Sequence, residues 1–559
     1  MMGAWDRLKK MFSDKTSRNI FLYTFICGLM AHGFVFFNKL AWHDELQHGF
    51  RLSASRVMAL GRWLRAGLGW IVAKLFGDYN LSLPWVHGLI SVFFISLSVL
   101  LIIRLFHIKE KAYQILVAGL LVSFPVVAST FGYMFTAPYY FIALFLSVWA
   151  VYLTYRMKNV WGLILGAGLI CSSMAIYQPY VGVAVSLFVI LLIIDIAKNR
   201  YNGVAGIFKH GFYYLGTCLG GVVGYMVMWK VTMAIFGIKA GDYQGISSMG
   251  EGGIGKYFDG VARAYKSFLM QFENPIEDVY PMSLSVVQWI IIIGSLLLGL
   301  YLAGRQFKKH KGQAVLMLLL IAILPLALNV VYVMASSSAE SKVHSLMLYG
   351  MAMLYVFFIC ALREATKRKT DTVFDPKSAE EVKIPEAAEA SEDTKDSEEA
   401  EAPENEKRKF RPAGLIAGLA TAVLFVAMFM MIYISNAAYL RADMQQQQAI
   451  SDLTVLTAKI KTLDGYTDNM KVCFVMEGKR DKTRTTNKEF ANITFMPYTN
   501  VYPYHNQRNV ANFLEHWCGF APTYVSQKQF KDREEVKAMP SYPDDGSIKI
   551  IDDTVVIKW

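Results

Sequence analysis

Charged residues are scarce in this sequence. Asp, Glu, Lys and Arg together make up 18% of the 559 residues, whereas hydrophobic residues make up 54% and aromatic residues 14%. An ordinary soluble domain carries about 25% charged residues. The mean hydropathy is positive, and the apolar residues gather in many long runs. This composition excludes an ordinary soluble protein and predicts a polytopic membrane protein.

Other signals are also missing. Only six cysteines occur, and four of them sit in or near apolar runs, where we expect small packing residues. No cluster has the spacing of a metal site. We therefore predict no cofactor, and metal dependence stays open. The charged stretch "WDRLKKMFSDKTSRN" precedes the first apolar run, and no small-residue cleavage pattern follows. This indicates a signal anchor with a cytoplasmic N-terminus.

Basic residues outnumber acidic ones, with 56 Lys and Arg against 44 Asp and Glu and a formal net charge of +12. Most of the basic residues lie in short clusters between apolar runs, such as "HIKEK", "YRMK", "AKNR", "RQFKKHK" and "REATKRK". Such clusters stay on the cytoplasmic side of a membrane. The membrane topology therefore explains the excess of positive charge, and we expect no nucleic-acid partner.

A membrane-spanning helix needs about 20 apolar residues. We therefore predict an all-α polytopic membrane protein with about 11 transmembrane helices and a small C-terminal extracytoplasmic α/β domain. Pro179 in "YQPY" favours a tight turn between two of the helices. The predicted spans lie near 19–38, 84–105, 113–130, 138–155, 161–178, 179–196, 211–236, 286–304, 314–334, 343–362 and 414–436.

The chain divides into four predicted parts. Residues 1–365 form the multi-span membrane body, and residues 366–412 are rich in Glu, Ala, Ser and Pro, which is typical of a disordered acidic linker on the cytoplasmic side. Residues 413–436 form the last transmembrane helix. Residues 437–559 form the extracytoplasmic domain.

The C-terminal part combines helix and strand patterns. Ile450, Leu453, Leu456, Ile460 and Leu463 recur at helical spacing, and strand-like runs follow at "KVCFVM", "ANITFM" and "IKIIDDTVVIKW". On an oxidising side of the membrane, Cys473 and Cys518 would form a disulfide. Two free thiols are the alternative.

Two adjacent carboxylates, Asp44 and Glu45, follow the first apolar run and open the predicted outer loop 39–83. Residues 53–76 of this loop have helical periodicity. We expect an amphipathic helix that lies along the membrane interface, with Trp63 and Trp70 at headgroup level. One stripe carries Val57, Leu60, Leu64, Leu68, Ile71 and Leu75, and the other carries Arg51, Ser55, Arg62 and Arg65.

Carboxylates beside cations at a membrane surface suit the transfer of a sugar from a lipid phosphate. The leaving phosphate gains negative charge as its bond to the sugar breaks, so Arg or Lys should lie nearby. The acceptor hydroxyl loses a proton, which requires a general base. Asp44 or Glu45 suits this role. The alternative is that the acid pair only caps a helix or solvates the loop.

Three short motifs follow one another along the chain in a defined order. The acid pair is followed by "GRW" (Gly61, Arg62, Trp63) on the amphipathic helix and by "YQ" (Tyr177, Gln178) at the outer end of a later span. This order and topology resemble the Gtr-type (type II) serotype-converting glucosyltransferases. The resemblance covers most of the ten predicted helices of the membrane body. The resemblance implies the GT-C architecture, a polyprenyl-phosphate sugar donor and Asp44 as catalytic base. Glu45 stands where that family often has a second Asp.

Other residues receive roles in the same hypothesis. Arg62, Lys230 and Arg51 would bind the donor phosphate. For Lys230, within a span, the alternative is an ammonium that snorkels to the interface. The glycine-rich outer loop 237–285 suits either a mobile lid or a plain connector. The predicted sugar- or acceptor-binding residues are Trp42, His43, Trp63, Tyr177, Gln178, Lys342 and His344.

The resulting hypothesis is a glycosyltransferase in a bacterial cytoplasmic membrane. It would move a hexose such as glucose from a polyprenyl-phosphate carrier, for example undecaprenyl-phosphate glucose, to a cell-surface polysaccharide such as O-antigen or its lipid-linked precursor. Its partners would be the bilayer, a cytoplasmic polyprenyl-phosphate sugar synthase and a flippase. The alternatives are a transporter or flippase, which often has repeated halves, and a polysaccharide polymerase or protein glycosyltransferase. We find no internal repeat, which disfavours the transporter.

Overall fold

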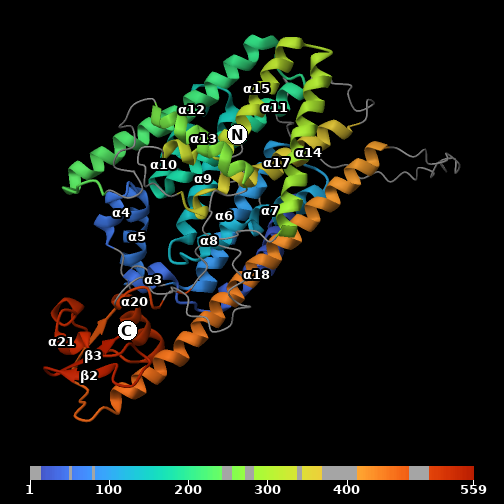
Figure 1. Ribbon diagram of the computed structural model, residues 1–559. Helices are drawn as coiled ribbons and strands as arrows, with labels where there is room; N and C mark the ends of the chain where they lie inside the picture. The colour runs from blue at the N-terminus through green and yellow to red at the C-terminus, as the bar shows by residue number, and fades with distance from the viewer. Residues whose placement is uncertain are drawn as a thin grey trace, which may run out of the picture.

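The computed structural model describes residues 14–48, 53–77, 82–241, 255–270, 282–335, 343–367, 412–476, 501 and 503–559. Within these ranges, helices pack into one elongated bundle, and a small α/β domain lies beyond one end of it (Figure 1). We call this end the domain end. The opposite end, where helix α17 (Met353–Thr366) ends and helix α18 (Pro412–Lys461) begins, is the linker end.

Nine helical segments among the described residues are long and apolar enough to cross a membrane, and ten if a bent pair is counted as one span. The protein is therefore a multi-pass membrane protein, as predicted. The nine segments are Lys15–Phe37, Pro84–Leu105, Ala137–Met157, Val160–Ala197, Gly203–Phe236, Ser283–Phe307, Lys311–Leu328, Tyr349–Thr366 and Gly414–Lys461, and the bent pair is Lys111–Ser123 with Pro125–Phe131.

The bundle consists mainly of long helices joined by short turns. Helix α8 starts with a proline, which explains the 40° bend after α7, because the residue before a proline leaves the helical region. The helices are α2 (Lys15–Phe37), α6 (Pro84–Leu105), α7 (Lys111–Ser123), α8 (Pro125–Phe131), α9 (Ala137–Met157), α10 (Val160–Tyr177), α11 (Val181–Ala197), α12 (Gly203–Phe236), α14 (Met282–Phe307), α15 (Lys311–Leu328), α16 (Val331–Met334) and α17.

The segment 160–197 doubles back at the short 3-10 turn η1 (Gln178–Tyr180). At one end of α9, the hydroxyl of Thr154 donates to the carbonyl of Gly162 at 3.2 Å, and the hydroxyl of Tyr155 donates to Asp195 at 3.4 Å. The start of α10 and the end of α11 therefore lie at the same end of α9, and the two helices form a hairpin. Among the described residues, the nine candidate segments become eleven passes, the predicted number, when this hairpin is counted as two and the bent pair as one.

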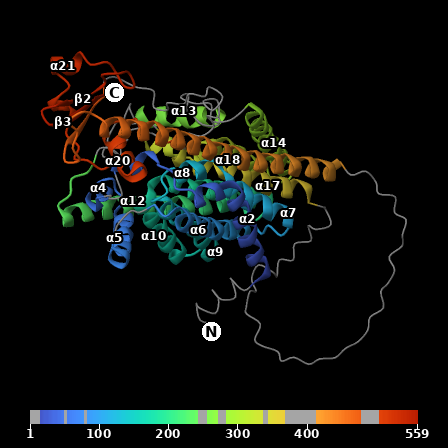
Figure 2. The same cartoon turned by 90° about the horizontal axis from the view of Figure 1, so that it is seen from below.

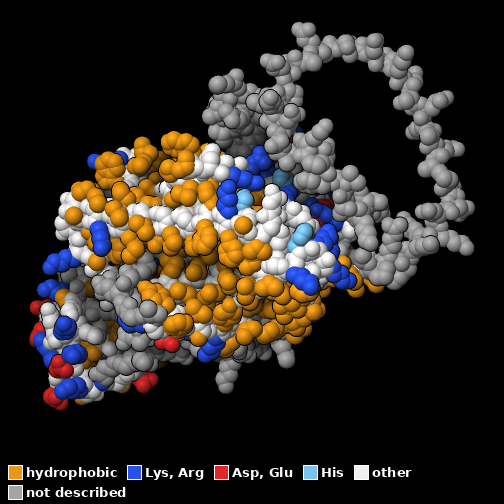
Figure 3. Space-filling model, turned by 90° about the horizontal axis from the view of Figure 1, so that it is seen from above, with side chains coloured by type: hydrophobic (Ala, Val, Ile, Leu, Met, Phe, Trp, Pro, Cys, Tyr) orange, Lys and Arg blue, Asp and Glu red, His pale blue; other side chains and the backbone are white. Residues whose placement is uncertain are grey.

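Apolar side chains cover the outside of the bundle. Figure 3 shows them over a broad area between an end with Lys, Arg and His side chains and the C-terminal domain, whose surface carries both signs of charge. An apolar surface of this extent is what a lipid-exposed bundle presents. Exposed members include Phe212, Leu215 and Leu219 on α12, Leu296 and Leu297 on α14, and Leu319 on α15.

Helix α18 joins the bundle to the C-terminal domain. Its 50 residues correspond to about 75 Å at 1.5 Å per residue, which is more than twice the thickness of a hydrocarbon layer. Figure 2 shows the helix lying lengthwise along the bundle and continuing into the domain. The predicted boundary at residue 436 therefore lies inside an unbroken helix. His32 pins this helix, because its ring nitrogens lie 2.8 Å from the Tyr439 hydroxyl and 2.8 Å from the Val122 carbonyl.

The C-terminal domain has a three-stranded sheet in the order β1-β3-β2. Strand β1 (Lys471–Val475) pairs in parallel with β3 (Thr554–Lys558), which forms an antiparallel hairpin with β2 (Ile548–Ile551). The predicted strands in "KVCFVM" and "IKIIDDTVVIKW" are thus confirmed, the latter as a hairpin, while "ANITFM" lies outside the described residues. Helices α20 (Gln507–Cys518) and α21 (Glu534–Lys537) accompany the sheet.

The predicted disulfide is wrong, because Cys473 and Cys518 are both free in the structure. Alternate residues of a strand face opposite sides of a sheet. Cys473 packs with Phe530 and Val556 on one face, whereas Cys518 lies at the end of α20 against the core on the other face. Burial raises the pKa of the Cys473 thiol to about 11 and also raises that of Cys518.

Short helices cover the domain end. Residues 53–76, predicted as one helix, form α4 (Ala54–Ala59) and α5 (Trp63–Phe76) with a break between them, and α3 (His43–His48) precedes them. Helix α13 (Gly255–Leu269) lies within the predicted loop 237–285 and packs against the end of α15: Asn329 Nδ2 donates to the Ala264 carbonyl at 3.2 Å. The domain end thus combines segments from the whole chain.

Candidate functional site at the domain end

The break between α4 and α5 is a tight turn at Gly61. This glycine has a φ of +75°, which an L side chain rarely adopts, and a Cβ atom here would lie 2.1 Å from the Tyr225 hydroxyl oxygen. The turn therefore requires glycine for two independent reasons. It aims Arg62, the first residue after the turn, into the bundle.

The turn is docked by side chains from distant helices. Gln178 Nε2 donates to the Leu60 carbonyl at 2.8 Å and to the Tyr225 hydroxyl at 3.0 Å. Trp229 Nε1 donates to the Met58 carbonyl at 3.2 Å. The "GRW" and "YQ" motifs, more than 100 residues apart in the sequence, therefore meet at one place.

Arg62 is buried among tyrosines, with 8% of its surface exposed. Its Nη1 donates to the Tyr140 hydroxyl at 2.9 Å. The guanidinium carbon lies 5.2 Å from the ring centre of Tyr177 and 5.7 Å from that of Tyr140, and these two rings stack at 3.9 Å. Tyr177 is only 1% exposed, so its ring holds the arginine and presents no open face to a sugar.

Arg65 lies one turn further along α5 and is also buried, at 6% exposure. Its guanidinium carbon is 5.9 Å from the Tyr139 ring centre. Burial lowers the pKa of Arg65, while nearby Tyr140 and Asp44 favour its charged form and Arg62 opposes it. Within the described part of the chain, its buried Nε has no hydrogen-bond partner. A buried cation of this kind is stabilised by an anionic ligand.

The two adjacent acids occupy different environments. Asp44 is half-buried and interacts electrostatically with Arg65. Glu45 is 3% exposed and forms an ion pair with Lys39. Burial raises the pKa of Glu45 and lowers that of Lys39, although their mutual attraction acts in the opposite direction. Glu45 is thus engaged within the protein by Lys39, whereas Asp44 interacts with Arg65.

Two other predicted residues, Trp42 and Lys230, lie in different surroundings. Trp42 is 2% exposed and pairs through its backbone with Val501, so its ring is not available for stacking on a sugar. Lys230 is exposed, beside the buried face of α12 that carries Tyr225 and Trp229. An exposed side chain is what the snorkelling alternative expects, and the donor-phosphate role of Lys230 stays a prediction.

Of five further predicted residues, the structure describes the side chains of two. Trp63 is half-buried beside Arg62, and its buried Nε1 has no hydrogen-bond partner among the described residues. His344 is half-buried and precedes the 3-10 turn η2 (Ser345–Met347). His43 begins α3, but its side chain lies outside the described parts. Arg51 and Lys342 also lie outside them.

The structure adds residues that the motifs did not single out. Tyr139, Tyr140 and Tyr225 surround the arginines, and Arg65 joins Arg62 at helical spacing. The signal for Arg65 was present, because it lies on the same polar stripe as Arg62. The tyrosines belong to spans in which aromatic residues are common, so nothing in the sequence distinguished them.

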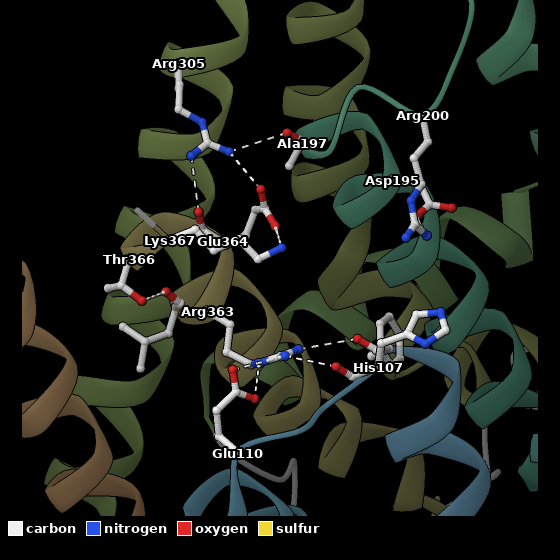
Figure 4. Close-up of polar contacts among 12 residues, drawn as sticks. His107, Glu110, Asp195, Ala197, Arg200, Arg305, Arg363, Glu364, Thr366 and Lys367 are labelled. Atoms are coloured by element: carbon white, nitrogen blue, oxygen red, sulfur yellow. Dashed lines mark hydrogen bonds and ion pairs between the residues drawn. The ribbon is translucent and has the colours of Figure 1, made fainter. Parts of the chain in front are cut away.

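A second polar cluster lies at the linker end, and its cations are paired (Figure 4). Arg200 Nη1 lies 3.0 Å from Asp195, Arg305 Nη2 lies 3.1 Å from Glu364, and Arg363 Nε lies 2.8 Å from Glu110. Arg363 also donates to the carbonyl of His107 at 2.9 Å. These pairs tie helix ends together and give the linker end a structural role.

No group of three or more His, Cys, Asp or Glu residues in the described parts could hold a metal ion. The assembled features are a multi-pass helical bundle and, at one of its ends, a carboxylate beside two buried arginines. They define a membrane protein with a site suited to an anionic ligand.

Residues 33–358 match the family model described as glucosyl transferase GtrII. The chain belongs to this family and is a membrane glucosyltransferase. The matched region contains the acid pair, the Gly61 turn and the tyrosines, and it ends before α18 and the C-terminal domain. Searches of curated proteins and of solved structures gave no match.

Proposed function

We propose that this glucosyltransferase uses a polyprenyl-phosphate-linked glucose as donor and a cell-surface polysaccharide or its lipid-linked precursor as acceptor. The reaction would take place at the outer face of a bacterial cytoplasmic membrane, on a bundle of the GT-C type. The observation that carries the proposal is the burial of Arg62 and Arg65 at the same end as Asp44. Two buried cations beside one carboxylate suit a phosphate leaving group and a hydroxyl nucleophile.

The donor phosphate would lie against the two guanidinium groups. Arg62 and Arg65 are held by tyrosine rings and by a hydrogen bond to Tyr140, so their positions are set before the donor binds. Preorganised charges stabilise a developing negative charge without further rearrangement. Lys230, on the exposed side of α12, has no part in this assignment.

Asp44 would act as the general base. Its carboxylate takes the proton from the acceptor hydroxyl while the acceptor oxygen forms a bond to the anomeric carbon of the sugar. The bond from that carbon to the phosphate oxygen breaks, and its electron pair leaves with the polyprenyl phosphate. Glu45 is an unsuitable base because it is already paired with Lys39 in a buried site.

The surroundings suit a lipid-linked donor. Trp70, Ile71 and Leu75 on α5 are exposed, so the apolar side of this helix is available to lipid while Arg65 is buried against the bundle. The polyprenyl chain would lie in the bilayer beside α5. Trp63 follows Arg62 directly and has no hydrogen-bond partner for its indole N–H in the described part of the chain, so we assign it to contact the sugar. A cytoplasmic synthase and a flippase would supply the donor.

Substitution Asp44→Asn tests the assignment. We expect transfer of labelled glucose from polyprenyl-phosphate glucose in isolated membranes to fall at least about 100-fold, since general base catalysis contributes that much or more. The matched control is Asp464→Asn, at an exposed position just beyond α18. Transfer rates are compared at equal protein abundance. Full activity of the Asp44 variant would remove this carboxylate from the mechanism.

A further inference from the structure

The helix that carries Asp44 is too short to be stable alone. Helix α3 has six residues, whereas isolated helices shorter than about 12 residues are marginal in water. Its conformation must therefore come from its neighbours. Those neighbours are the extension of α18 and the C-terminal domain (Figure 1).

Gln446 holds the chain just before α3. Its Oε1 accepts from the backbone N–H of Ala41 at 2.6 Å, and its Nε2 donates to the Lys39 carbonyl at 3.0 Å. One side-chain amide thus satisfies two backbone groups, as a neighbouring strand would. Gln446 is 6% exposed, so water does not readily replace these bonds.

Two further contacts hold the rest of the segment. Trp42 forms an antiparallel bridge with Val501, and the backbone N–H of Val501 donates to Gln445 Oε1 at 3.2 Å. At the other end of α3, Asn512 Nδ2 on α20 donates to the Leu46 carbonyl at 2.5 Å. Contacts therefore hold the segment before α3, at its start and within it.

The Lys39–Glu45 ion pair lies under the same domain. Lys39 Nζ is 5.9 Å from the ring centre of Trp517 on α20. The side chain that neutralises Glu45 is therefore itself covered by the C-terminal domain. The ion pair engages Glu45 within the protein, whereas Asp44 interacts with Arg65.

We infer that the extension of α18 and the C-terminal domain together position Asp44, with Gln446 on α18 and Asn512 on α20 as positioning residues. The inference rests on the proposed role of Asp44 as base. These residues lie beyond the region 33–358 that matches the family model. A glucosyltransferase body would thus depend on a separate part of the same chain for the geometry of its acidic helix.

The test compares two neighbouring glutamines in the full-length protein. Gln446→Met keeps the volume of the side chain and removes both hydrogen bonds, and Gln447→Met is the matched control because Gln447 is exposed on the same helix. We expect Gln446→Met to lower kcat at least about tenfold with an unchanged KM for polyprenyl-phosphate glucose, since a small misplacement of a reacting group is costly. Gln447→Met should match the unmodified protein.

Amide hydrogen exchange in residues 41–48 provides a readout that does not need activity. We expect faster exchange there in Gln446→Met and not in Gln447→Met. Unchanged exchange would overturn the proposed clamp. Faster exchange with full activity would overturn the positioning role, and Asp44→Asn then shows whether the proposed base has failed as well. If Gln446→Met lowers protein abundance, Asn512→Leu tests the same inference from the other end of α3.

Discussion

At the residue scale, the most informative groups are Arg62, just before α5, and Arg65, on α5. A guanidinium over an aromatic ring gains about 0.5 to 2 kcal/mol, more when the pair is desolvated. Tyrosine rings therefore help to hold Arg62 and Arg65 in place at the end of the bundle where Asp44 lies.

Substitution of Arg65 should affect the chemical step. We expect Arg65→Gln to lower kcat about 10- to 100-fold, because negative charge on the phosphate grows as its bond to the sugar breaks. Arg65→Lys should recover only part of this loss, since an ammonium lacks the planar fork of a guanidinium. Initial rates at varied donor concentration measure both effects. Arg56→Gln, at an exposed position on α4, is the control, and an equal loss in it would argue against a specific role.

The two cysteines of the C-terminal domain should both react as thiols. After denaturation without reductant, we expect a maleimide to label Cys473 and Cys518 fully. In the native protein, labelling of Cys473 should be slow at pH 8 and rise with pH, because a pKa of about 11 leaves about one thousandth of the group as thiolate. Peptide mass spectrometry reads out each site. If labelling required prior reduction, the two cysteines would form the predicted disulfide and would not be free thiols.

At the element scale, the turn between α4 and α5 organises the site. It converts one amphipathic segment into two helices and directs Arg62 toward Tyr140. Gln178, in the turn between α10 and α11, and Tyr225, on α12, both contact this turn. The position of Arg62 therefore depends on how these helices pack against the turn.

Substitution Gly61→Ala should destabilise the protein by about 1 to 3 kcal/mol, because the added methyl group overlaps the Tyr225 hydroxyl in a tightly packed site. Glucosyl transfer should fall as well, since Arg62 would shift. Gly67→Ala on α5 is the control: a Cβ there meets nothing within 4 Å, and it should be neutral or slightly stabilising. Thermal unfolding in detergent measures stability. Equal behaviour of the two variants would show that the turn tolerates a side chain.

Local patterns predicted some elements and not others, for identifiable reasons. The spans follow from runs of apolar residues, and Pro179 marks the hairpin between α10 and α11. The helical period of residues 53–76 was also present, but it does not say whether a polar stripe faces water or a buried site. The bonds from Gln446 to Lys39 and Ala41 join residues about 400 positions apart. No local pattern specifies a contact of that kind, so the clamp on α3 could not be predicted.

At the scale of the whole molecule, the two ends of the bundle differ in chemistry. Ion pairs such as Arg363 with Glu110 close the linker end (Figure 4). The domain end instead brings Asp44, two buried arginines and the C-terminal domain together. Such a polarised molecule suits an enzyme whose donor is made on one side of the membrane and used on the other.

This polarity predicts the orientation of the protein. In intact spheroplasts, a membrane-impermeant maleimide should label Asp464→Cys, at the exposed domain end, and should label Lys158→Cys, exposed at the linker end, only after permeabilisation. The unmodified protein gives the background from its native cysteines. The basic clusters between the spans argue for this orientation, because they are retained on the cytoplasmic side. The opposite labelling pattern would place Asp44 in the cytosol, where it could not meet a donor and an acceptor at the outer surface.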